Sequence, residues 1–125
     1  ASDEVLLVSK PELPALTNAL GAKKLAKQLE RDVIGLVLNE VREEDHEVEH
    51  QDIKELIGEE VIGKVPDHRH VREAIALRNP VVSYKPDSRA SHAIEDVAYQ
   101  IRGEEPPKRG FSTKIKYKVD EFNLL

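Results

Sequence analysis

The sequence of 125 residues contains no cysteine, no methionine and no tryptophan, and only 4% of its residues are aromatic. Without cysteine the chain has no disulfide framework, no thiolate metal site and no cysteine nucleophile, and this composition fits a reducing compartment. No apolar run approaches the ~20 residues that a membrane-spanning helix needs. Because methionine is absent, we expect the sequence to begin downstream of a translation start.

The charge of the chain is moderately acidic. Charged residues make up 34% of the sequence, and the formal net charge is −5. An acidic balance argues against general nucleic-acid binding over the surface, so no nucleic-acid partner is expected. The length suits one domain with a substantial core.

Short apolar runs alternate with segments of helical periodicity. This alternation predicts an α/β fold with a mainly parallel sheet of about four strands covered by helices. We expect residues 1–103 to form the domain, 104–109 a linker and 110–125 a basic amphipathic tail. The predicted strands are residues 5–9, 32–39, 61–65 and 80–84, and the helices are 11–29, 50–57, 71–77 and a final one capped by Ser88.

One segment imitates a phosphate-binding loop. Gly58, Gly63 and Lys64 match the spacing G-x-x-x-x-G-K. A phosphate loop requires a strand before it and a helix after it, whereas here a helix precedes the pattern and a strand lies inside it. Val65 also stands where a hydroxyl side chain would bind magnesium. We therefore interpret the segment as a helix end followed by a buried strand, and we assign no catalytic residue.

Five short motifs follow one another in a fixed order. They read D-E-V-L-L-V-S-K-P-E at residues 3–12, G-L-V-L-N at 35–39, V-I-G-K-V-P-D at 61–67, V-R-E-A at 71–74 and P-V-V at 80–82. Their order and spacing resemble the C-terminal half of the MinD/ParA-like ATPases with a deviant Walker A motif. The similarity covers about residues 3–103 and looks closest to the archaeal MinD proteins. It implies a partial P-loop NTPase fold.

The resemblance implies roles for four residues. In this family the asparagine that ends the second motif holds the adenine, and it corresponds to Asn39. The loop after the third motif lines the other side of the base, which implies contacts from Pro66 and Asp67. Glu12 would lie near a dimer interface and the nucleotide of the partner. The alternative for Asn39 is an amide that satisfies backbone groups at a strand end.

The chain departs from the family pattern near these residues. Lys10 replaces an asparagine, Glu40 an arginine and His68 an acidic residue. A carboxylate at Glu40 is expected to repel a phosphate-bearing ligand, whereas arginine would attract it.

The catalytic parts of the family, namely the phosphate loop, the switch segments and the magnesium-holding aspartate, do not occur in this sequence. Phosphoryl transfer depends on such groups, so we expect the chain alone not to hydrolyse ATP and to bind ATP or ADP with magnesium only together with the missing N-terminal half. That half, or a homodimer partner, is the expected binding partner. The strand at residues 5–9 would then present an unpaired edge.

The tail combines basic and apolar residues. Its helical arc predicts an amphipathic membrane anchor, as in MinD-like proteins, and implies a cytoplasmic protein at the inner face of the membrane. Residues 113–120 also alternate strictly, which is a strand pattern, and packing on the domain itself is a further alternative. The residues expected to contact anionic lipid are Phe111, Lys114, Ile115, Lys116, Val119 and Phe122.

Two functions of different classes remain open from the sequence. The first is the C-terminal portion of a MinD-like ATPase that positions a division site or cargo, supplying adenine contacts, dimer surface and a membrane tether. The second is a stand-alone, non-enzymatic interaction module that kept the fold. Five histidines include a 46/50 pair and a 68/70 pair, but surface positions explain them better than a metal site.

Overall fold

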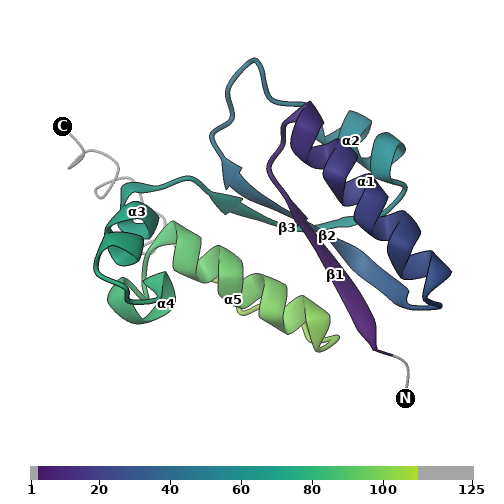
Figure 1. Ribbon diagram of the computed structural model, residues 1–125. Helices are drawn as coiled ribbons and strands as arrows, with labels where there is room; N and C mark the ends of the chain where they lie inside the picture. Colours follow the sequence, from purple (N-terminus) through teal and green to yellow (C-terminus); the bar gives the residue numbers. More distant parts are fainter. Residues whose placement is uncertain (1–2, 110–125) are drawn as a thin grey trace. The chain divides into compact units, whose positions relative to one another are not determined.

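The computed structural model describes residues 3–109, which are drawn as ribbon in Figure 1. The chain divides into two compact units, Ala1–Pro66 and Asp67–Leu125. None of the helices within the described range is both long and apolar enough to cross a membrane.

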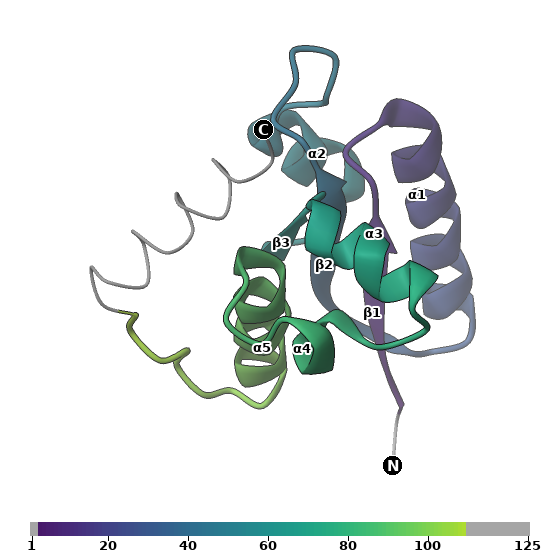
Figure 2. The same ribbon diagram turned by 90° about the vertical axis from the view of Figure 1, so that its left-hand side faces the viewer.

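The first unit is a three-stranded parallel sheet in the order β1-β2-β3. Its strands are β1 (Glu4–Ser9), β2 (Asp32–Val41) and β3 (Val61–Pro66). The connecting helices α1 (Leu13–Gln28) and α2 (His50–Ile57) lie side by side against the sheet (Figures 1 and 2). The prediction of an α/β fold with a parallel sheet covered by helices is confirmed.

Local sequence explains where the two helices begin and end. Pro14 occupies the first turn of α1, where the absent N–H costs no intrahelical hydrogen bond. Gly58 ends α2 in the left-handed conformation, at φ 72°. The Lys23 ammonium donates to the carbonyl oxygen of Ile57 at 2.6 Å and pairs with Glu59 at 3.2 Å, so α1 also holds the end of α2. The core between helices and sheet consists of Leu7, Leu16, Ala19, Leu36, Leu38, Ile53 and Ile57.

The second unit is helical as far as it is described. It contains α3 (Arg69–Ala76), α4 (Val81–Tyr84) and α5 (Arg89–Ile101). The prediction of a fourth strand at residues 80–84 is therefore wrong. Pro80 precedes the segment, and its carbonyl accepts the N–H groups of both Ser83 and Tyr84, which closes a helical turn. Two adjacent valines favour a strand only weakly against such local bonds.

The start of α5 explains why this turn is stable. The Ser88 side chain caps α5 by accepting the N–H of Ser91 at 3.2 Å, as predicted for Ser88. The Ser91 hydroxyl is fully buried and lies 3.0 Å from the carbonyl oxygen of Val81 and 2.6 Å from that of Lys85. Val81 and Lys85 already accept the backbone N–H groups of Lys85 and Ser88, so the Ser91 hydroxyl adds a second polar contact and connects the start of α5 to the turn of α4.

The segment after α5 returns to that helix. Arg109 lies with its guanidinium 2.7 Å from Asp96 and 3.4 Å from Glu95, and its side chain is only 17% exposed. This paired guanidinium attaches the last described residue to α5. Burial, followed by repulsion from Arg109, lowers the pKa of His92 on the same helix.

Within the described residues, β1 pairs with β2 and forms one edge of the sheet. A groove of about 490 Å³ runs along this edge, lined by β1 and by the small residues Ala15, Ala19 and Ala22 of α1. Val8 is 57% exposed there, although a continuous apolar run such as residues 5–9 is typical of a strand buried on both faces. An apolar strand edge beside a helix face of small residues leaves room for a further strand.

Candidate functional site

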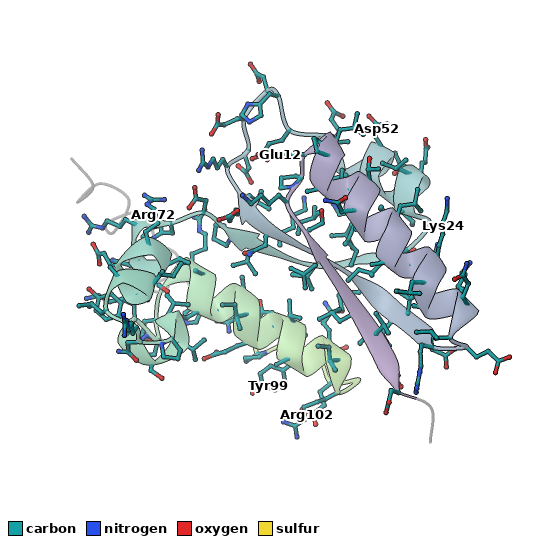
Figure 3. The ribbon with its side chains drawn as sticks, in the orientation of Figure 1. Glu12, Lys24, Asp52, Arg72, Tyr99 and Arg102 are labelled. Atoms are coloured by element: carbon teal, nitrogen blue, oxygen red, sulfur yellow. The ribbon has the colours of Figure 1, made fainter. Side chains whose placement is uncertain are left out.

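The carboxyl ends of the three parallel strands lie at the same edge of the sheet, because all three run in one direction. In open parallel sheets this edge is where ligands bind. Three of the residues predicted for the site belong to it. Asn39 is exposed near the end of β2, and Pro66 is half-buried as the last residue of β3. Glu12 is exposed at the turn from β1 into α1 (Figure 3).

Asn39 lies in a distortion of β2. Leu38 pairs with Lys64 and Val41 pairs with Pro66, so β2 holds one residue more than β3 over this interval. Glu40 takes up the extra residue with φ 54°, a left-handed conformation that is uncommon for glutamate. Bulges of this kind redirect side chains and are frequent beside binding sites. The strand also continues two residues beyond the predicted end at Asn39.

Two of the three residues that depart from the family pattern, Lys10 and Glu40, contact each other. The Lys10 ammonium lies 2.8 Å from a carboxylate oxygen of Glu40, across the ends of β1 and β2. The hydrogen bond that Lys10 donates to Glu40, reinforced by the opposite charge, raises the pKa of Lys10, so its ammonium group stays protonated at neutral pH. The carboxylate that was expected to repel a phosphate is thus neutralised by its neighbour.

The loop after β2 is ordered by one carboxylate. Glu47 accepts the backbone N–H of Arg42 at 2.7 Å and that of Glu43 at 3.1 Å. The next residue, Val48, donates its N–H to the carbonyl oxygen of Pro11 at 2.9 Å. This hydrogen bond attaches the loop after β2 to the turn between β1 and α1, so the loop borders the carboxyl edge of the first unit.

Asp67, the fourth residue predicted for the site, is the first residue of the second unit. Its carboxylate is 2.8 Å from the guanidinium of Arg72 and its side chain is 11% exposed. The next residue, His68, caps α3 by accepting the N–H of His70 through Nδ1 at 3.2 Å. Across residues 3–109 no three histidine, aspartate or glutamate side chains converge as a metal site.

The imitation of a phosphate loop has the structure expected from the sequence. Gly58 ends α2, and Gly63 and Lys64 lie inside β3. Lys64 therefore lies within a strand, and a helix does not follow the pattern directly as a phosphate loop requires. The predicted membrane-contacting residues lie outside the described residues: Phe111, Lys114, Ile115, Lys116, Val119 and Phe122.

Comparison with known proteins extends these observations. The sequence profile of a family described as AAA domain matches residues 2–74. An uncharacterized ATP-binding protein of Methanocaldococcus jannaschii is 32% identical over 122 residues, which are 98% of this chain and 44% of that protein. The chain thus spans less than half the length of this curated relative.

Solved structures agree with the fold. The cell division ATPase MinD of Pyrococcus furiosus superposes with a TM-score of 0.75 and 26% identity, over 80% of this chain and 42% of that one. The septum site-determining protein MinD of Pyrococcus horikoshii, complexed with Mg-ADP, gives a TM-score of 0.73 and 22% identity, over 78% and 40% of the two chains.

Proposed function

The chain belongs to the AAA domain family, as a relative of the MinD and ParA P-loop ATPases, and we propose that it forms the adenine-binding part of a nucleotide site. In this proposal Asn39 binds the base from the end of β2, and Pro66, with Asp67 beyond it, lines the other side. Glu12 contributes to a surface for a second subunit. The larger protein is a MinD-like ATPase that positions a division site or cargo.

One observation carries the proposal. Asn39 is an exposed amide within a bulge at the carboxyl edge of a parallel sheet, next to the strand that ends at Pro66. An amide offers both a donor and an acceptor, which is the pattern that the edge of an adenine requires. The half-buried ring of Pro66 offers an apolar surface for the face of the base.

The residues described fit the base better than they fit the magnesium ion. The edge supplies an amide, an apolar ring and the paired charges of Lys10 and Glu40. No cluster of metal-binding side chains occurs in residues 3–109. We therefore assign adenine recognition to this chain, whereas magnesium and most phosphate contacts would come from the part of the relatives that it does not cover.

The Asn39→Ala variant tests the base contact. We expect it to weaken ATP binding about tenfold, because an adenine edge then loses its partner in a partly desolvated site. The measurement is calorimetry on a chimera in which residues 1–125 replace the aligned part of the M. jannaschii relative. Asn79→Ala, an exposed asparagine of the second unit, is the matched control. Equal ATP affinity of the two variants would refute the adenine assignment.

The membrane tether is proposed for residues 110–125. Removal of these residues should weaken binding to liposomes rich in anionic lipid by about a hundred-fold, since they include three lysines and each basic residue near such a surface contributes on the order of 1 kcal/mol. A variant with Lys114→Gln and Lys116→Gln should show an intermediate loss, and neutral liposomes serve as the control. Equal sedimentation of the full and the shortened chain would rule out the anchor.

A second function, a non-enzymatic interaction module, is favoured by the groove along β1. The open edge and the small residues of α1 beside it suit a β-strand of another polypeptide that extends the parallel sheet. The Asn39→Ala experiment separates the two functions, because the module would not require Asn39.

A further inference from the structure

The strongest feature that adenine recognition does not use is the ion pair between Lys10 and Glu40. The pair bridges the ends of β1 and β2 at 2.8 Å, and the two side chains are 54% and 45% exposed. Exposed pairs of this kind add little to stability and exchange partners readily. The charges of Glu12 and Arg42 also act on the pKa of Lys10, which therefore lies among the charged groups of the carboxyl edge.

Glu40 occupies the extra position of the bulge in β2 with φ 54°, a conformation that glutamate adopts less readily than glycine or asparagine. Glu30, Glu43 and Arg78 also have a positive φ, so this conformation places the side chain without assigning it a function. In this conformation the carboxylate reaches Lys10 on the neighbouring strand, and Asn39 directly precedes it.

The order of the strands gives the direction in which a nucleotide would extend, if its base lies at Asn39 and Pro66 as proposed above. Those residues belong to β2 and β3, and neighbouring strands are about 4.8 Å apart. The phosphates of a nucleotide that follows the carboxyl edge away from β3 therefore pass the end of β1. Lys10 immediately follows β1, and an ammonium group is a frequent phosphate ligand.

We propose that Lys10 binds a phosphate of the nucleotide and that Glu40 holds this lysine in place until the phosphate displaces the carboxylate. Glu40 then competes with the ligand for one ammonium group. The proposal rests on the proposed function for the position of the base, but it makes a separate statement about phosphate. The two side chains should then affect phosphate affinity in opposite directions. Loss of Lys10 removes a group that binds the phosphate, whereas loss of Glu40 removes a group that competes with it.

The test uses NMR titration of the 125-residue chain with three probes: ATP, adenosine and inorganic tripolyphosphate. We expect Lys10→Gln to weaken ATP and tripolyphosphate binding about fivefold to tenfold and to leave adenosine binding unchanged. Glu40→Gln should strengthen binding of both phosphate probes. The double variant should resemble Lys10→Gln, and Lys10→Arg should retain binding because it keeps the charge.

The outcomes separate this inference from the proposed function. Tripolyphosphate shifts centred on Lys10, with no adenosine shifts at Asn39, would support the lysine assignment while refuting the base site. Adenosine shifts at Asn39 with unchanged tripolyphosphate affinity in Lys10→Gln would overturn the lysine assignment alone. Weaker ATP binding in Glu40→Gln would also overturn it, because the carboxylate would then support binding and not compete with the ligand.

Discussion

The Gly35→Ala variant should lose about 2–4 kcal/mol of unfolding free energy, because the added methyl group has no space and the backbone is unfavourable for alanine. A Cβ at Gly35 would lie 2.8 Å from Cγ2 of Ile62 and 3.2 Å from the carbonyl oxygen of Glu60. Its φ of 154° is also one that side chains rarely adopt. Leu36 donates its N–H to the same Glu60 carbonyl at 2.9 Å, so the strands cannot separate there without losing that bond.

Two comparisons make this prediction specific. Gly21→Ala, on the exposed surface of α1 with nothing within 4 Å of the new methyl group, should gain about 0.5–1 kcal/mol. In the background of Gly35→Ala, Ile62→Ala removes the clashing Cγ2 atom and should recover about 1 kcal/mol of unfolding free energy. Ile62→Val keeps that atom and should not restore stability in the same background. Urea unfolding followed by circular dichroism measures all four. Equal stability of Gly35→Ala and the unmodified chain would contradict the prediction.

Gly35 also shows what the sequence could and could not predict about the sheet. The apolar runs predicted the three strands, and Gly58 as a helix end helped to predict α2. The bulges did not, because each depends on the register between two strands that are distant in sequence. Gly35 pairs with Leu6 directly after one register shift, and Ile62 lies in another, opposite Leu36 and Val37. Their close approach is a property of the assembled sheet.

The candidate site was predicted in a similar, partial way. The resemblance drew attention to Asn39 and Pro66, and the structure puts both at one edge of the sheet. It also drew attention to Lys10 and Glu40, but as two separate departures from the family pattern. Opposite charges at the ends of two strands become partners only when those strands are neighbours. Their pairing in the structure replaces an expected repulsion by a neutral pair.

The error at residues 80–84 has a different cause. A short apolar run after a proline fits a strand and a helical turn equally well by pattern alone. The decision depends on which hydrogen bonds are available nearby. One such hydrogen bond joins the buried Ser91 hydroxyl to the carbonyl oxygen of Val81, which lies ten residues earlier in the chain. A propensity argument over five residues does not include that contact.

The isolated chain is expected to bind ATP at least about a hundred-fold more weakly than the chimera with the M. jannaschii relative, and to release no phosphate. A hundred-fold loss corresponds to about 2.7 kcal/mol, which one or two charge-assisted hydrogen bonds to phosphate already supply. At the carboxyl edge of the first unit we assign one such bond to Lys10, whereas Lys64 lies within β3. The open edge at β1 has room for the strand that would carry further phosphate contacts.

Calorimetry with ATP and a phosphate-release assay, on both proteins under the same conditions, measure this difference. Adenosine is the informative control, because it tests the base contact without the phosphates. If Asn39 binds the base and the relative supplies the phosphate contacts, adenosine affinity should differ far less between the two proteins than ATP affinity does. Micromolar ATP binding by the isolated chain would show that its own residues bind the triphosphate, and would refute the division of the site between the two parts.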